Sequence, residues 1–193
     1  MREYDEIAEW FTATRSPDVG VPDLTAFAET LPPGARVLDL GCGDGVPISQ
    51  TLLRAGLAVT ALDSSPAMVE QFRAHVPGVP VRCARIQDAR FARGAFDAVV
   101  AWGVLFHLSE ADQTTAIRKV AEWLTPTGRF LFTSGGSRGV AESEMDGVPF
   151  RYVSLGAVGY RDVLARAGMR MVRHYADAWQ NDVYVAEKAT SPD

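Results

Sequence analysis

Five short apolar runs, most of them separated by an amphipathic segment, constrain the fold of this chain more than any other feature. The apolar runs predict buried strands, and the segments between them predict helices, as in βαβ units around a parallel sheet. Ser65 followed by Pro66 is a typical helix start and supports this division. The predicted strands are 35–40, 58–63, 80–84, 96–101 and 128–134, and the predicted helices between them are 46–56, 66–75 and 109–124.

The last part of the chain follows a different pattern. A predicted helix near 156–167 precedes two runs, 169–176 and 181–188, that only a short turn separates. Two neighbouring strands with so short a link must be antiparallel. The sequence therefore predicts an α/β fold with a doubly wound, seven-stranded, mostly parallel sheet and a C-terminal antiparallel hairpin.

Charge and cysteine content argue against several classes of protein. The net charge of -5 argues against nucleic-acid binding, which usually needs a basic surface. No window approaches 18 uncharged apolar residues, and the acidic start MREYDEIAEWF does not resemble a signal peptide, so we expect no membrane association. The two cysteines, Cys42 and Cys83, are too few for a disulfide framework and lack metal-ligand spacing. We expect a cytoplasmic protein without a bound metal.

The loop after the first predicted strand is rich in glycine. VLDLGCGDGVP at 37–47 contains Gly41, Gly43 and Gly45, which permit positive φ and leave room for a ligand against the backbone. A dinucleotide fingerprint needs a third glycine at position 46 or 48, and a P-loop needs a lysine, and neither is present. Asp39 and Asp44 would repel a diphosphate. The loop therefore favours a ligand that presents a cation.

A carboxylate at the end of the second predicted strand adds to this picture. Asp63 can accept hydrogen bonds from both hydroxyls of a ribose. A nucleoside that carries an ammonium group rather than a phosphate would suit both the acidic glycine loop and this carboxylate.

Five motifs, in order, resemble those of class I S-adenosylmethionine-dependent methyltransferases. They are DLGCGDG at 39–45, ALDSSPAM at 61–68, QDA at 87–89, FDAVV at 96–100 and LTPTGRFLF at 124–132. The resemblance implies a Rossmann-like sheet, S-adenosylmethionine as cofactor, S-adenosylhomocysteine as product, and methyl transfer to an acceptor.

The resemblance also implies a division of the chain into parts. We expect a single domain over 1–193, with a cofactor-binding core at 34–134 and a C-terminal helix and hairpin at 155–188. Residues 1–33, with predicted helices at 3–12 and 22–31, would form a lid. The insert 135–154 opens with glycines and hydroxyl groups and ends in an aromatic stretch, so it predicts a mobile loop followed by a wall of the acceptor site.

The resemblance implies roles for individual residues around the cofactor. Asp63 would hold the ribose hydroxyls, Asp39 would order the glycine loop near the amino group, and Asp88 would accept from the adenine amine. The Trp102 carbonyl would receive the ammonium group, and Arg15 would pair with the methionyl carboxylate or be an ordinary surface arginine. The other candidates are Tyr4 in the lid, Gly41, Cys42 and Gly43 in the loop, and Ala89, together with Ser64, Met68 and Gln87, which could instead only cap or fill.

The sequence defines the site of the methyl acceptor less clearly than the cofactor site. Methyl transfer needs alignment and exclusion of water, and it needs a base only where the acceptor must lose a proton. His107 is the candidate catalytic base, with a structural role as the alternative. With so little chain outside the core, we expect a small-molecule acceptor, methylated at oxygen. Aromatic residues that could line its pocket, or pack in the core instead, are Trp10, Phe106, Phe150, Tyr152 and Tyr160.

The sequence alone leaves other functions open. The chain could bind S-adenosylmethionine for a reaction other than methyl transfer, or be a non-catalytic module that binds this nucleoside or S-adenosylhomocysteine. Ala101-Trp102-Gly103-Val104 stands where enzymes that methylate amino groups of nucleobases or glutamine carry Asn/Asp-Pro-Pro-Tyr/Phe. The two cysteines are too few for an arsenite methyltransferase. The chain would act as a monomer or a homodimer.

Overall fold

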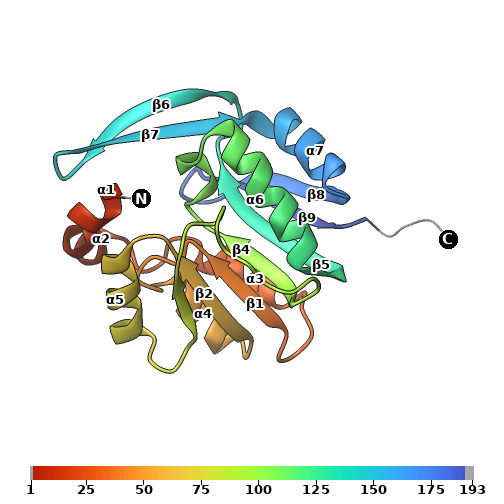
Figure 1. Cartoon of the computed structure of the whole chain (residues 1–193), viewed down its shortest axis with the longest axis horizontal. Helices are drawn as coiled ribbons and strands as arrows, with labels where there is room; N and C mark the ends of the chain where they lie inside the picture. The colour runs from red at the N-terminus through yellow and green to blue at the C-terminus, as the bar shows by residue number, and fades with distance from the viewer. Residues whose placement is uncertain (1, 190–193) are drawn as a thin grey trace.

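A seven-stranded sheet forms the centre of the computed structural model, which describes residues 2–189 (Figure 1). The first five strands run parallel, and β9 runs antiparallel to both of its neighbours. This arrangement confirms the predicted doubly wound sheet with an antiparallel hairpin at its end. The strand order is β3 (Val81–Cys83), β2 (Ala58–Asp63), β1 (Arg36–Leu40), β4 (Phe96–Ala101), β5 (Leu124–Ser134), β9 (Asp182–Lys188) and β8 (Met169–Ala176).

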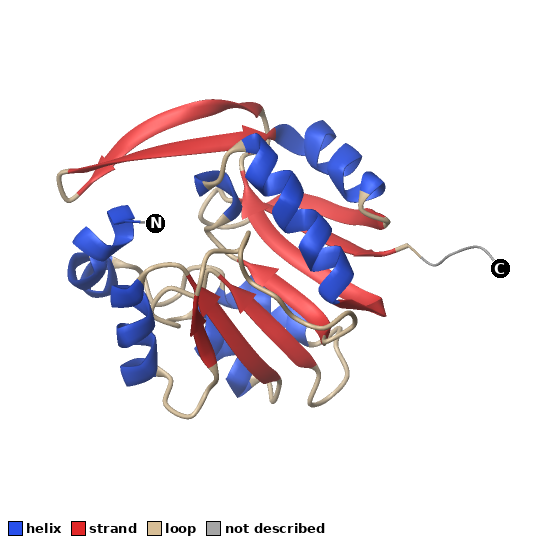
Figure 2. Cartoon of the chain, viewed as in Figure 1, coloured by secondary structure: helices blue, strands red, loops and turns tan. Residues whose placement is uncertain are grey.

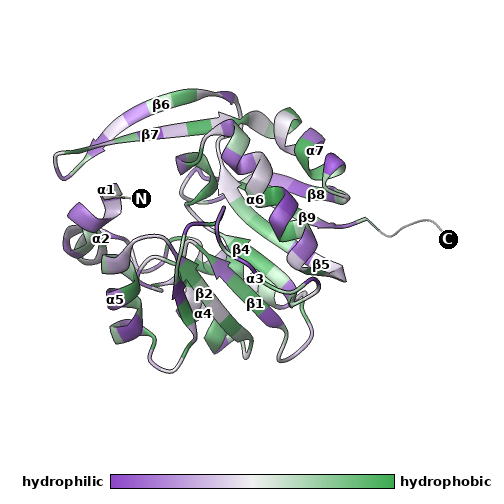
Figure 3. Cartoon of the chain, in the orientation of Figure 1, coloured by the Kyte–Doolittle hydropathy of each residue, from purple (hydrophilic) through white to green (hydrophobic). Residues whose placement is uncertain are grey.

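Helices cover both faces of this sheet (Figure 2), because alternate residues of each buried strand point to opposite sides. Leu38 and Leu40 of β1 pack in one apolar core, and Val37 packs in the other. Figure 3 shows the central strands largely in green, as expected for strands buried on both faces. The covering helices are α3 (Val21–Ala28), α4 (Ile48–Arg54), α5 (Pro66–His75), α6 (Glu110–Trp123) and α7 (Gly156–Arg166).

Local sequence signals set two of these helix starts. The Ser65 hydroxyl accepts a 3.1 Å hydrogen bond from the amide of Met68, which confirms the predicted cap of α5. The Ser109 hydroxyl accepts in the same way from the amide of Asp112 at the start of α6. About half of the predicted boundaries coincide with the observed ones, and the others differ by one to four residues, as frayed element ends usually do.

The predicted helix 3–12 is divided in two. Its parts are α1 (Arg2–Glu6) and α2 (Ala8–Thr14), and between them Ile7 leaves the helical conformation and is only 1% exposed. Asp5 of α1 accepts hydrogen bonds from the Ser65 hydroxyl and the Ala67 amide at the start of α5. Contacts with the rest of the protein therefore bend the segment, which a helical repeat alone could not indicate.

The insert 135–154 is not the mobile loop that the sequence predicts. It forms a two-stranded antiparallel sheet of β6 (Arg138–Met145) and β7 (Val148–Leu155), separate from the main sheet. The turn between them is Asp146-Gly147, both with positive φ, which is a typical hairpin signal. Figure 1 shows this hairpin extending away from the sheet toward α1. The apolar pattern does not predict these strands because β6 is exposed along nearly its whole length and has no apolar alternation.

Candidate active site

A cavity of about 470 Å³ lies at the carboxyl ends of the central parallel strands. Gly41 and Gly43 reach it from the loop after β1, Asp63 from the end of β2, and Trp102 and Gly103 from the residues after β4. Strand order reverses at β1, which lies between β2 and β4. Ligands of doubly wound sheets bind at this point of the fold.

Two glycines of the loop are required for different reasons. Gly41 has φ +76°, and a Cβ there would lie 2.2 Å from Cγ2 of Val104, so packing excludes a side chain. Gly43 has φ +53°, and a Cβ there would meet no atom within 4 Å. Because Gly43 lines the cavity, it leaves space beside the backbone that a ligand can use.

The carboxylate of Asp63 is fixed by backbone amides. Its Oδ2 accepts a 2.9 Å hydrogen bond from the Gly43 amide, and its Oδ1 accepts a 2.9 Å hydrogen bond from the Ser65 amide. Burial raises the pKa of Asp63, and these amide hydrogen bonds act in the opposite direction. Each oxygen keeps acceptor capacity for a ligand hydroxyl.

Asp39 lies behind the glycine loop and is only 1% exposed. The Ser49 hydroxyl donates a 2.6 Å hydrogen bond to its Oδ2. Burial raises the pKa of Asp39 to about 7, while the Ser49 hydrogen bond and the charge of Arg15 oppose the rise. Asp39 is therefore a support of the loop that does not itself line the cavity.

Arg15 follows α2 and lines the cavity. Burial lowers its pKa, and the nearby Asp44, Tyr4 and Asp39 oppose this effect. Its guanidinium lies 5.3 Å from the centre of the Phe11 ring, and within residues 2–189 this group has no hydrogen bond or ion pair. A half-buried guanidinium of this kind suits an anionic group of a ligand.

His107 lies in the short helix η1 (Leu105–His107) and lines the same cavity. Its Nε2 is 3.1 Å from the hydroxyl oxygen of Tyr4. Burial lowers the pKa of His107 to about 4 and raises the pKa of Tyr4, so both side chains are neutral at pH 7. A neutral imidazole is the form that can accept a proton.

Aromatic rings surround His107. The centre of its ring lies 5.4 Å from that of Tyr4, 4.7 Å from Phe106, 5.8 Å from Phe150 and 5.2 Å from Tyr152. These rings come from α1, η1 and β7, which are far apart in the sequence. They form one aromatic wall beside the cavity.

A smaller cavity of about 160 Å³ adjoins this wall. His107 and Leu108 line both cavities, and Glu3, Ser109 and Arg151 line the smaller one. His107 therefore borders both cavities.

Most of the residues predicted from the sequence line the main cavity, and they come from six separate segments of the chain. Tyr4 belongs to α1, Arg15 directly follows α2, and Met68 belongs to α5. The residues that line the cavity as predicted are Tyr4, Arg15, Gly41, Gly43, Asp63, Ser64, Met68, Gln87, Trp102, Phe106, His107 and Tyr152.

Other predicted cofactor residues do not reach the cavity. Asp88 is exposed and forms a 2.8 Å ion pair with Arg85, and Ala89 is buried in the core. Cys42 is buried behind the loop, as is Asp39. The side chains of Asp88 and Ala89 would therefore contact a ligand in the cavity only if residues 85–89 moved.

Three predicted acceptor residues also lie elsewhere. Trp10 is 37% exposed on α2, on a different side from Phe11, which does line the cavity. Tyr160 is fully buried and its hydroxyl donates a hydrogen bond to Gln113, so it belongs to the core. Phe150 packs on Tyr4 and lines only the smaller cavity.

Several lining residues were not predicted. Met145 comes from the end of β6, and Asn181 from the turn before β9. The Asp146-Gly147 turn would have indicated the hairpin and hence Met145. No sequence signal points to Asn181.

Residues 37–128 match the family model described as a methyltransferase domain. Over these residues the chain is a methyltransferase domain. The match spans the first four of the five motifs and confirms the resemblance to class I S-adenosylmethionine-dependent methyltransferases.

The methyltransferase domain has related sequences and structures. The ubiquinone biosynthesis O-methyltransferase of Xanthomonas axonopodis pv. citri is 39% identical over 128 residues, which are 64% of this chain and 52% of that protein. The chain thus spans about half the length of the curated relative it matches.

Two solved structures share the fold. The CcbJ methyltransferase of Streptomyces caelestis superposes with a TM-score of 0.79 at 19% identity, covering 97% of this chain and 98% of that one. The 1,6-didemethyltoxoflavin-N1-methyltransferase of Burkholderia thailandensis, solved with 1,6-didemethyltoxoflavin and S-adenosylhomocysteine, gives a TM-score of 0.69 at 20% identity, covering 89% and 79%. At these identities the likeness concerns the fold.

Proposed function

We propose that this chain transfers a methyl group from S-adenosylmethionine to the oxygen of a small-molecule acceptor and releases S-adenosylhomocysteine. The observation that carries the proposal is the rigid Asp63 carboxylate beside the open backbone of Gly43, at the edge of the sheet where this fold binds its ligands. The name of the Xanthomonas relative, an O-methyltransferase, supports oxygen as the acceptor atom.

The residues around the main cavity fit the cofactor. Asp63 would accept from the ribose hydroxyls, Arg15 would pair with the methionyl carboxylate, and the carbonyl of Trp102 would accept from the ammonium group. Ser64, Met68 and Gln87 also line the cavity, and they would lie against the adenine. When bound, S-adenosylmethionine supplies an electrophilic methyl group on a sulfonium, so the chain need only orient the acceptor and exclude water.

The aromatic wall supports an acceptor that is small, flat and uncharged. Phe106, Tyr152 and Tyr4 present rings to this side, with Met145 from the hairpin. His107 would accept the proton that a hydroxyl loses as its oxygen gains the methyl group. The hairpin 138–155 and the N-terminal helices would close this side against water.

We also propose that the chain acts in the cytoplasm, as a monomer or homodimer, without nucleic-acid or membrane partners. The net charge of -5 and the free thiols of Cys42 and Cys83 support this. Among residues 2–189, no helix is both long and apolar enough to cross a membrane, and no group of three or more His, Cys, Asp or Glu residues is placed to hold a metal ion.

The experiment that tests the proposal follows S-adenosylhomocysteine formation by the full chain with S-adenosylmethionine. A cell extract and neutral phenols, such as methyl 3,4-dihydroxybenzoate, serve as sources of acceptor. We expect time-dependent product and a mass gain of one CH₂ group on an acceptor. Turnover without that gain would indicate another sulfonium-dependent reaction, and binding without turnover would indicate a non-catalytic module.

A further inference from the structure

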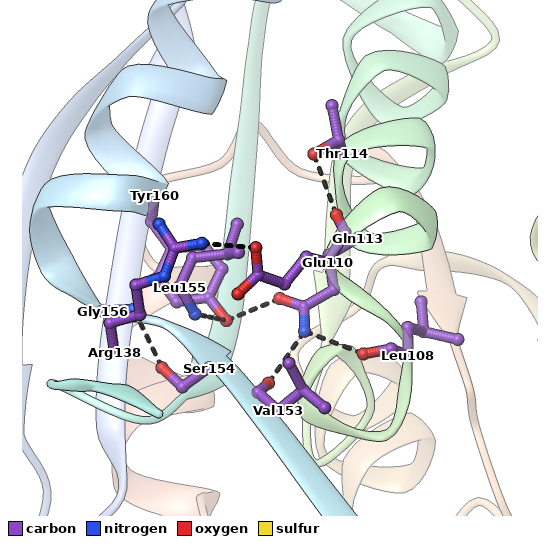
Figure 4. Close-up of polar contacts among 10 residues, drawn as sticks. All are labelled: Leu108, Glu110, Gln113, Thr114, Arg138, Val153, Ser154, Leu155, Gly156 and Tyr160. Atoms are coloured by element: carbon purple, nitrogen blue, oxygen red, sulfur yellow. Dashed lines mark hydrogen bonds and ion pairs between the residues drawn. The ribbon is translucent and has the colours of Figure 1, made fainter. Parts of the chain in front are cut away.

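Gln113 of α6 is completely buried, and its side-chain amide makes three hydrogen bonds (Figure 4). Its Nε2 donates to the carbonyl of Leu108 at 3.0 Å and to the carbonyl of Val153 at 2.8 Å. Its Oε1 accepts from the hydroxyl of Tyr160 at 2.7 Å. Because carbonyls only accept, the two carbonyls fix which end of the amide is the nitrogen.

Each of the two carbonyls belongs to a residue that directly follows a member of the aromatic wall. Leu108 directly follows His107, and Val153 directly follows Tyr152. The rings of His107 and Tyr152 lie 5.2 Å apart, although η1 and β7 are distant in sequence. One side-chain amide thus joins the two backbone segments that carry neighbouring rings of the aromatic wall.

The amide is itself held by the core. The Tyr160 hydroxyl is also bonded to the hydroxyl of Ser134 at the end of β5, and it accepts a weak hydrogen bond of 3.4 Å from the Leu155 amide. Figure 4 shows Gln113, Tyr160 and Leu155 gathered between α6, α7 and the base of the hairpin. At the surface, Arg138 and Glu110 form a 2.6 Å ion pair between the same elements, but both are exposed, so their pair is weak.

We infer that Gln113 is a positioning residue, which holds His107 against Tyr152 by bonding to the carbonyls that follow both. Loss of the amide would leave two carbonyls without their donor, and the hairpin base and η1 would separate to reach water. The effect on catalysis rests on the proposed function, whereas the positioning can be measured without an acceptor.

The test compares Gln113→Leu with Ile117→Ala in the full chain. Leu has a similar size but no hydrogen-bonding groups. Ile117 lies one turn later on α6 and is also 0% exposed, so its truncation destabilises the same region by forming a cavity without removing the amide. The measurements are NMR contacts between the His107 and Tyr152 rings and the pH titration of the His107 imidazole.

In the wild type we expect ring contacts and a low titration midpoint for His107. The titratable and charged groups that face it are Tyr4, Tyr152 and, across the smaller cavity, Glu3 and Arg151. Gln113→Leu should lose the ring contacts and raise the midpoint by about one unit or more, because the imidazole becomes hydrated. Ile117→Ala should keep both signals.

The inference is overturned if Gln113→Leu keeps the contacts and the midpoint, or if Ile117→Ala loses them equally. Should Gln113→Leu not fold, Gln113→Met provides the same test with an unbranched side chain. Affinity for S-adenosylhomocysteine should stay within about twofold of the wild type in both variants, because neither Gln113 nor Ile117 lines the main cavity. If the wild type itself does not bind that nucleoside, the proposed function fails while the His107 measurements still decide the role of Gln113.

Discussion

The amide of Gly43 donates a 2.9 Å hydrogen bond to Oδ2 of Asp63, so the glycine loop and the acid that ends β2 form one unit. The amides of Gly41 and Cys42 also donate to the carbonyl of Leu62, at 2.7 and 3.1 Å. The chain's own hydrogen bonds therefore hold the ligand-binding edge of the sheet in place. Such preorganisation lowers the cost of binding.

Replacing Asp63 by Ala should weaken binding of S-adenosylhomocysteine by about 100-fold, because two ribose hydrogen bonds and the loop support are lost. Titration calorimetry measures this directly. Asp88→Ala is the matched control, since Asp88 is exposed and lies outside the cavity lining. If both variants bind S-adenosylhomocysteine equally weakly, Asp88 contacts the adenine directly.

Alanine substitutions at Gly41 and Gly43 should affect stability and nucleoside binding differently. Gly41→Ala should lower the free energy of unfolding by more than Gly43→Ala, because its Cβ collides with Val104 while that of Gly43 meets open space. Gly43→Ala should cost about 1 kcal/mol for its positive φ, yet weaken nucleoside binding strongly. Chemical denaturation and calorimetry check the two effects, and the opposite ranking in stability would contradict the assigned contacts.

Arg15→Gln should weaken binding of S-adenosylhomocysteine by about tenfold through loss of a charged hydrogen bond to the carboxylate. Methylthioadenosine, which lacks the amino-acid part, serves as the control ligand and should bind wild type and variant alike. If both ligands weaken equally, Arg15 supports the fold of the lid and does not contact the carboxylate.

Burial of neutral His107 should make stability depend on pH. Its pKa is about 4 in the folded protein, against 6.5 for an exposed imidazole, so between these values the unfolded state binds more protons. The contribution is therefore present above pH 6.5 and is lost as the pH falls toward 4. His107→Gln should show a flatter decline in Tm over this range. An unchanged slope would mean that His107 titrates normally in the folded protein.

Sequence patterns predicted the parts of this protein whose signals are local. The strands buried on both faces appear as continuous apolar runs, and Ser65 carries its own capping signal. The bend at Ile7 and the core position of Tyr160 depend on contacts with distant elements, so no local pattern contains them. The hairpin was missed because β6 is exposed, and only its Asp146-Gly147 turn indicated it.

The most direct test of the account is a thermal-shift series of the full chain with S-adenosylmethionine, S-adenosylhomocysteine, NAD and ATP. A ligand at about 100 times its Kd stabilises the folded state by about 2.7 kcal/mol, which for a domain of this size raises Tm by roughly 5 to 10 °C. We predict this rise with the two sulfur nucleosides alone, and its loss in Asp63→Ala. A rise with NAD and none with the sulfur nucleosides would contradict the proposed cofactor, and with it the proposed function.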